Sequence, residues 1–288
     1  MKTLAFIHRN DTRFAVGDFS PVLSVLSYQE LGSTVSPFLL LDHIGPGRLR
    51  PDNGKRGVNP HPHRGFETVT LVLSGELQHR DSQGHGGVLG AGDVQWMTTG
   101  RGVIHEERFS DAFLANGGRF EMLQLWVNLP SRDKMMTARY QHLATGCIPA
   151  TTLPSGTRIR VIAGCWQHLR GPAETRTRVQ LLEVHLMAGD ALPISVPEGD
   201  TAMVYLLSGS LAADDGNLVE EHALLVYGSH GADLLLITTT RAHLLVMTGE
   251  PLNEPVFGHG PFVMNNHAEI VQAYEDVKAG NLEAPVGH

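Results

Sequence analysis

Short apolar segments recur along the chain, many of them alternating, and glycine or proline residues separate them. The clearest are residues 68–73, 122–129, 179–186, 203–207 and 243–247. Strands of this length with turn residues between them are typical of antiparallel sandwiches and barrels, whereas parallel sheets alternate strands with helices. The pattern therefore predicts an all-β protein.

One segment near the C-terminal end has the pattern of a helix instead. Asn266 suits the N-cap position, with Glu269 three residues later as in a capping box, and Gly280 suits the C-terminal end. The apolar stripe of this helix would consist of Ile270, Val271, Tyr274 and Val277. We expect a short helix to follow the last strands.

A short repeat relates the two halves of the chain. Leu73-Ser-Gly-Glu-Leu recurs as Leu207-Ser-Gly-Ser-Leu, and the Ser-Gly pair predicts a turn between strands in both copies. A match of five residues can arise by chance, but the simplest interpretation is a duplicated β-domain. We place the domains at residues 1–135 and 136–288, the second ending in the helix. The proline-containing segment 131–178 would connect them.

Composition and charge exclude several classes of function. The 288 residues, 42% hydrophobic and 18% charged, suffice for about two globular domains. A net charge of −8 without a Lys/Arg-rich tract argues against direct nucleic-acid or anionic-membrane binding. Cys147 and Cys165 cannot form a disulfide scaffold, and neither a signal peptide nor a spanning segment is evident, so we expect a cytoplasmic protein.

Sixteen histidines remain to be explained, and two patterns among them suggest a metal site. His61 and His63 lie two residues apart in Pro-His-Pro-His, as His105 and Glu107 do in His-Glu-Glu. Residues two apart on a strand point to the same face, so Glu106 would point away. If the two strands face each other inside a barrel, three imidazoles and one carboxylate converge as ligands for a divalent transition metal.

Chance alone accounts for one such pair. With one histidine per eighteen residues, His-x-His is expected about once, so His61 and His63 carry little weight alone. The second pair at same-face spacing, in the same predicted domain, favours the metal site over coincidence.

The sequence around these residues resembles the pirin family of the cupin superfamily. The resemblance is carried by HPHRGFETVTLVLSGELQHRDSQGHGGVLGAGDVQWMTTGRGVIHEE and by the closing GEPLNEPVFGHGPFVMNNHAEIVQAYEDVKAG. It implies two tandem jelly-roll-like cupin barrels, with a metal only in the N-terminal one. The implied ligands are His61, His63, His105 and Glu107, and the implied metal is Fe(II), with Zn, Mn, Ni, Co and Cu as alternatives.

The same resemblance implies an activity. Many bacterial pirins are described as quercetinases, which cleave flavonols such as quercetin with O2 and release carbon monoxide. We expect Glu107 to act also as the base that accepts the proton of the flavonol 3-hydroxyl. The alternative is a redox-sensing pirin that binds a protein partner as a transcriptional co-regulator, without turnover.

Other residues receive a structural interpretation. Glu67 follows His63 at a spacing where many cupins have a ligand, and alternation would put it on the same side as His61 and His63. Pirins resemble one another in using the later glutamate, so we favour a supporting role. His79 is expected to be a hydrogen-bonded structural histidine. Shifting His61, His63 and Glu67 by the repeat offset gives Ser195, Pro197 and Thr201, which are not usual ligands, so the second barrel is expected to hold no metal.

Overall fold

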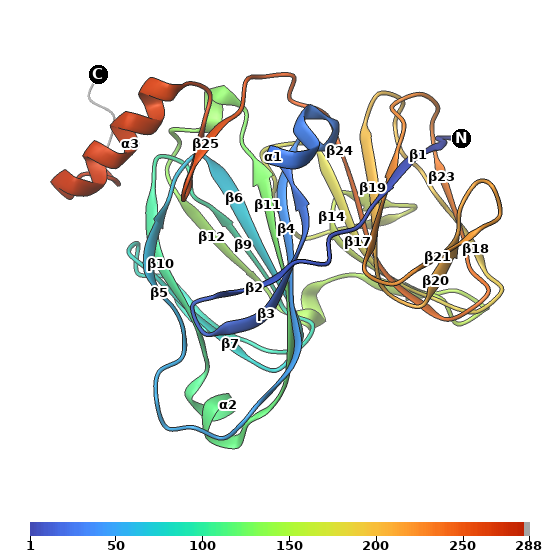
Figure 1. Ribbon diagram of the computed structural model, residues 1–288, viewed down its shortest axis with the longest axis horizontal. Helices are drawn as coiled ribbons and strands as arrows, with labels where there is room; N and C mark the ends of the chain where they lie inside the picture. Colours follow the sequence, from blue (N-terminus) through green and yellow to red (C-terminus); the bar gives the residue numbers. More distant parts are fainter. Residues whose placement is uncertain (285–288) are drawn as a thin grey trace. The chain divides into compact units, whose positions relative to one another are not determined.

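The chain folds into two compact units, and each end of the chain belongs to the unit that the opposite half mainly forms. The computed structural model describes residues 1–284, and strands dominate it (Figure 1). The N-half unit comprises Thr12–Ser24, Phe38–Thr145 and the segment from Asn253 onward. The C-half unit comprises Met1–Asp11, Val25–Pro37 and Gly146–Leu252. The predicted all-β class with a C-terminal helix is confirmed.

This division departs from the expected one at residues 1–135 and 136–288. The change of unit at Thr145/Gly146 lies within the expected connecting segment, but each end of the chain joins the other half. The first strand, β1 (Leu4–His8), pairs with β22 (Ala223–Tyr227), and near the other end Val263 donates its N–H to the Arg64 carbonyl at 3.1 Å. Backbone N–H and C=O groups pair with whichever sheet edge or loop the fold brings near, irrespective of distance along the sequence.

Two sheets form the N-half unit. The seven-stranded sheet has the order β12 (Arg139–Leu143), β9 (Val94–Thr98), β6 (Phe66–Ser74), β11 (Gly118–Asn128), β4 (Phe38–Leu49), β3 (Phe19–Ser27), β2 (Arg13–Val16). The four-stranded sheet has the order β5 (Gly57–His63), β10 (Val103–Phe109), β7 (Leu77–Asp81), β8 (Gly86–Leu89). One buried cluster contains Phe19 and Met122 from the first sheet and Leu77 and Phe109 from the second, so the two sheets pack face to face.

The C-half unit repeats this plan. Its main sheet has the order β1, β22, β19 (Thr201–Ser208), β24 (Ala242–Gly249), β17 (Val179–Leu186), β14 (Arg158–Ala163), β13 (Ala150–Thr152). Three two-stranded pairs accompany this sheet: β15 (Cys165–Trp166) with β16 (Leu169–Arg170), β18 (Ala191–Ile194) with β23 (Leu234–Ile237), and β20 (Ser210–Ala212) with β21 (Leu218–Glu220). A fourth pair, β25 (Phe257–His259) with β26 (Phe262–Met264), belongs to the N-half unit. Val184, Val204 and Leu244 of the main sheet share a core with Leu192 and Leu236 of β18 and β23.

The five predicted strands fall in β6, β11, β17, β19 and β24. The repeated Ser-Gly pairs also behave alike, because Gly75 after β6 and Gly209 after β19 both have φ +86°. Side chains rarely adopt this left-handed conformation, so glycine is needed at both turns. The repeat therefore marks the same turn in each unit.

The predicted helix is present as α3 (His267–Ala279). The other described helical segments are short: α1 (Tyr28–Leu31), η1 (Gly32–Val35), α2 (Asp111–Asn116), η2 (Ser131–Asp133) and η3 (Thr145–Cys147). Asn266 caps α3 through the Glu269 N–H at 3.0 Å, and Gly280 ends it at φ +72°. The stripe is wrong at Val271, which is exposed, because Ala273 takes the buried place beside Ile270. Among the described residues, no helix is long and apolar enough to cross a membrane.

Two buried cations attach the C-terminal segment to the turn between β5 and β6, directly after the Pro-His-Pro-His motif. Arg64 donates to Asp276 of α3 at 2.7 Å and to the Leu282 carbonyl at 2.9 Å. Lys134 Nζ donates to the carbonyls of Gly65 at 2.8 Å and Val263 at 2.9 Å. A side chain at Gly65 could not be accommodated, since its Cβ would lie 2.1 Å from the Val263 carbonyl oxygen. The segment from Asn253 onward is therefore part of the N-half unit.

We expect the substitution Lys134→Met to destabilise the protein by about 3 kcal/mol or more. It removes the donor that serves three buried acceptors, the third being Asn128 Oδ1 at 2.7 Å, and each acceptor left unsatisfied costs roughly 1–3 kcal/mol. Urea unfolding measures the change. Lys278→Met on the exposed surface of α3 is the matched control. Equal midpoints for the two variants would contradict the assignment.

Candidate metal centre

Neighbouring strands of the four-stranded sheet carry the four predicted ligands. His61 and His63 are on β5, His105 and Glu107 on β10, and His105 is directly opposite His61 in the register. The ring centroids of His61 and His105 are 4.3 Å apart, and those of His63 and His105 are 5.0 Å apart. The nitrogen donors of the three histidines lie within 4.8 Å of one another. The structure thus brings the three imidazoles together.

Each of these imidazoles has its Nδ1 directed to a second partner. His61 Nδ1 is 2.8 Å from the Asn59 carbonyl oxygen, and His63 Nδ1 is 3.2 Å from that of Pro261. His105 Nδ1 is 3.5 Å from His79 Nδ1. A carbonyl partner requires Nδ1 to carry the proton, which leaves the Nε2 lone pair for a metal. Consistent with this, His105 Nε2 is buried and has no hydrogen-bond partner among the described residues.

Burial keeps all three rings in the neutral form that binds metals. It lowers the pKa of His61, lowers the pKa of His63 to about 3, and holds the pKa of His105 well below its ordinary value. The neighbouring imidazoles act in the same direction on His63 and His105, because a second positive charge would be repelled.

Glu107 belongs to an overlapping group of donors with His79 and His105. Its Oε1 accepts hydrogen bonds from Thr70 Oγ1 at 3.1 Å and Gln95 Nε2 at 3.2 Å. Burial raises the pKa of Glu107 to about 7, against the opposing effect of these two hydrogen bonds. Two polar neighbours thus hold one oxygen of a carboxylate whose proton affinity is high.

His79 is expected to be a structural histidine, and this stays a prediction because His79 also belongs to the group of donors with His105 and Glu107. It is opposite Glu107 on β7, it is fully buried, and its ring stacks on that of Tyr140 with centroids 4.8 Å apart. Its Nε2 lies 3.6 Å from Asp81 Oδ2. His79 thus packs between Tyr140 and His105 and orients the latter.

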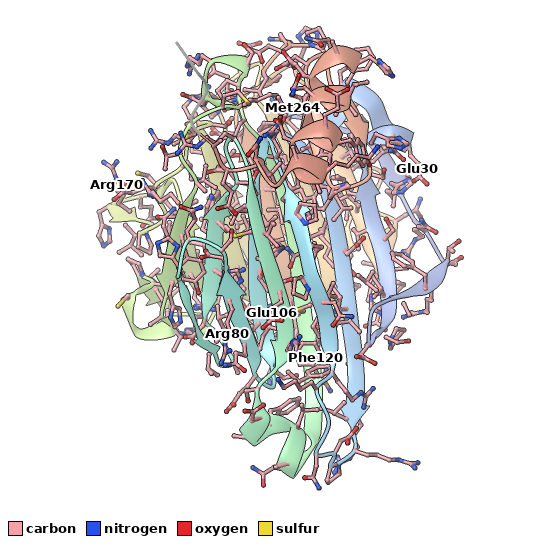
Figure 2. The ribbon with its side chains drawn as sticks, turned by 90° about the vertical axis from the view of Figure 1, so that its left-hand side faces the viewer. Glu30, Arg80, Glu106, Phe120, Arg170 and Met264 are labelled. Atoms are coloured by element: carbon pink, nitrogen blue, oxygen red, sulfur yellow. The ribbon has the colours of Figure 1, made fainter. Side chains whose placement is uncertain are left out.

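Side chains alternate between the two faces along β10, but this alternation does not continue across the turn after β5. Glu106 is opposite Arg80 in the register of β10 and β7 (Figure 2). By alternation it points to the other face from His105 and Glu107. Glu67, however, lies on β6, which begins after Gly65 has left the extended conformation at φ +91°. Thr70 on β6 contacts Glu107, so by alternation Glu67 points to the other face of that strand. It lies opposite Val127 in the register, and its Oε1 accepts from Thr98 Oγ1 at 2.6 Å. Glu67 joins no group of metal donors among the described residues.

A cavity of about 420 Å³ in the N-half unit adjoins the histidines. His61, His63 and Glu107 line it together with Gly260 and Pro261 of the C-terminal segment. Its remaining lining comes from β2 to β5 and β11: Val16, Phe19, Val22, Leu40, Asp42, Ile44, Val58, Met122, Gln124 and Trp126. Sequence reasoning missed this wall, since its residues lie on strands with no motif and are brought together only by the packing of the two sheets.

The C-half unit has a different arrangement. Among residues 1–284, no group of metal donors includes the positions Ser195, Pro197 or Thr201, whereas Glu183, His185 and His243 form one on the main sheet. These residues alternate with core residues of β17 and β24, so they face away from the core. Glu183 forms a buried ion pair with Arg160 and accepts from His243 Nε2 at 3.0 Å. The absence of a metal from the interior of this unit stays a prediction.

The donor set of the N-half unit fits a divalent transition metal. Three neutral imidazoles with free Nε2 atoms and a nearby carboxylate are the ligands preferred by iron and its neighbours. The arrangement could bind an ion at the edge of an apolar cavity, where a small organic molecule could reach it.

Comparisons with known proteins agree with this architecture. The family profile described as Pirin matches residues 20–127, and that of the Pirin C-terminal cupin domain matches residues 181–283. A Pseudomonas aeruginosa protein named "Putative quercetin 2,3-dioxygenase PA2418" is 47% identical over 98% of this chain and 99% of its own. The crystal structure of a quercetin 2,3-dioxygenase from Acinetobacter baumannii has a TM-score of 0.95 and 42% identity, covering 99% of this chain and 100% of that one.

A bacterial pirin, YhhW from Escherichia coli, solved in complex with nickel(II), has a TM-score of 0.65 and 18% identity over 85% of this chain and 99% of that chain. At this identity the likeness concerns the fold alone. The two family profiles together cover most of the sequence, with one profile in each half of the chain. The resemblance of the histidine motifs and the closing segment is thereby confirmed: this chain belongs to the pirin family.

Proposed function

We propose that the protein is an iron-dependent dioxygenase that cleaves flavonols such as quercetin with O2 and releases carbon monoxide. The observation that carries the proposal is the position of three neutral histidines and Glu107 beside an apolar cavity. The names of the Pseudomonas aeruginosa relative and of the Acinetobacter baumannii structure support it. Substrate and oxygen are the partners that this reaction requires.

His61, His63, His105 and Glu107 would hold the ion. Iron would accept further ligands beyond these four residues, whereas zinc in structural sites is usually satisfied by four protein ligands. Bound iron would supply Lewis-acid stabilisation of an oxyanion and the one-electron chemistry that O2 requires. We therefore favour Fe(II) over a structural ion.

The chain itself provides the proton transfer and the binding surface. Glu107 accepts the proton of the flavonol 3-hydroxyl, as a buried carboxylate at the edge of the cavity beside the histidines. Thr70 and Gln95 keep its Oε1 in place during the transfer. The apolar side chains of Phe19, Val22 and Met122 exclude water from the substrate rings.

The test is oxygen-dependent loss of flavonol absorbance by the iron-loaded protein, with carbon monoxide measured in the same sample. Stoichiometric consumption of flavonol and O2 with release of carbon monoxide is expected. Iron-loaded protein that binds its metal fully but consumes neither substrate would contradict the proposal. That result would favour the alternative, a redox-sensing protein that binds a partner without turnover.

A further inference from the structure

One carboxylate in the wall of the cavity has no role in metal binding. Asp42 lies on β4 between Leu40 and Ile44, and all three side chains line the cavity. Leu39, Leu41 and His43 point to the other face of the strand, as alternation requires. Asp42 thus occupies a position at which its two neighbours on the same face are aliphatic.

The surroundings leave part of this carboxylate without a partner. Asp42 is only 9% exposed, and its Oδ1 makes no hydrogen bond to any of the described residues. The Ser24 hydroxyl bonds to the side chain, and burial nevertheless raises the pKa of Asp42 to about 7. Buried carboxylate oxygens are usually hydrogen-bonded, so Oδ1 is open to a hydrogen bond from a molecule in the cavity.

The amide oxygen of the polar residue beside Asp42 in the cavity wall is already engaged. Gln124, opposite Asp42 in the register, uses its Oε1 to accept from Thr70 Oγ1 at 2.8 Å. Thr70 is also 3.1 Å from Glu107 Oε1, so Gln124 is linked to the metal side of the cavity. Among the described lining residues, Asp42 is the carboxylate that is not a predicted ligand. It is therefore available to a bound molecule.

We propose that Asp42 binds a hydroxyl group of the substrate, other than the one whose proton Glu107 accepts, and so selects polyhydroxylated aromatic molecules. Oδ1 accepts the hydrogen bond while the apolar wall contacts the rings. This inference rests on the proposed function for the class of substrate. A site that hydrogen-bonds a substrate hydroxyl discriminates strongly against analogues that lack it, because the buried partner then stays unpaired.

The test compares quercetin with analogues that each lack one hydroxyl other than the 3-hydroxyl. Binding is measured by fluorescence quenching of iron-loaded protein without oxygen, so that it does not depend on turnover. In the native protein, loss of one particular hydroxyl should weaken binding about 10- to 100-fold. In Asp42→Leu the same loss should change affinity by less than about twofold, because the partner is gone.

Two further variants make the result specific. Asp42→Asn keeps an acceptor oxygen of the same shape and should retain part of the discrimination, and it replaces the leucine variant if that one fails to fold. Ile44→Val changes the same wall without removing a polar atom and should leave the discrimination unchanged. Metal content is measured for every variant, so that binding is compared at equal iron occupancy.

The outcomes separate this inference from the proposed function. Hydroxyl-dependent binding that disappears in Asp42→Leu, without oxygen-dependent turnover, would leave Asp42 as a binding residue and overturn the dioxygenase. Turnover with equal discrimination in the native and Asp42→Leu proteins would overturn the role of Asp42 alone. An absence of hydroxyl-dependent binding across the whole series would also overturn it.

Discussion

The variant His63→Ala should lose its metal and its activity together. The ring of His63 lies 4.8 Å from that of His61 and 5.0 Å from that of His105, so its removal opens one side of the donor set. Removal of a group that only hydrogen-bonds to a metal-binding histidine typically lowers metal affinity 10- to 100-fold. Loss of a ligand itself should lower metal affinity by more than about 100-fold. Metal analysis after dialysis against a fixed concentration of free iron measures the change.

His168→Ala is the matched control, because His168 is exposed and joins no group of metal donors among the described residues. Circular dichroism of both variants tests whether the sheets remain. A His63→Ala protein that keeps full iron occupancy and native turnover would remove His63 from the ligand set. Loss of iron with the sheets intact would support it.

The variant Glu107→Gln should bind flavonol but turn it over far more slowly. Glutamine keeps the size of the side chain and an oxygen that can accept from Thr70 and Gln95, but it cannot accept a proton at neutral pH. General-base catalysis typically contributes 10²- to 10⁴-fold, and we expect a loss of kcat within that range. Steady-state turnover at saturating iron, with flavonol binding measured separately, gives both quantities.

Glu106→Gln provides the control, since Glu106 is adjacent in sequence but faces away from the site and pairs with Arg108 at 2.7 Å. Its kcat should stay within about twofold of the native value, as expected of a surface ion pair. Because Glu107 is also a predicted ligand, iron content is compared first. Unchanged turnover in Glu107→Gln at equal iron content would exclude it as the base.

Local sequence was enough to predict the strands, the turns and the histidines that the structure brings together as candidate metal donors. The spacing of two in Pro-His-Pro-His and in His-Glu-Glu places side chains on one face of a strand, whatever surrounds that strand. The Ser-Gly pairs and the cap at Asn266 act through the backbone within a few residues. Predictions that depend on such short distances therefore agree with the structure.

The parity of Glu67 could not be predicted in the same way. The prediction assumed that alternation continues from His63, but the chain turns at Arg64 and Gly65, where Gly65 has φ +91°. Alternation is a property of one uninterrupted strand, so it is lost wherever the backbone leaves the extended conformation. The prediction that Val271 is buried was wrong for a related reason. The elements that pack against a short helix decide which of its sides is covered.

The sequence by itself determined that this is an all-β protein with a duplicated domain and a His-rich candidate metal site in its first half. Only the tertiary structure decided what completes that site. Pro261, about two hundred residues away along the chain, accepts from His63, and Asp42 is brought to the cavity wall by the packing of two sheets. No local signal encodes such contacts, because burial and hydrogen-bond satisfaction are met by whatever part of the chain the fold brings near.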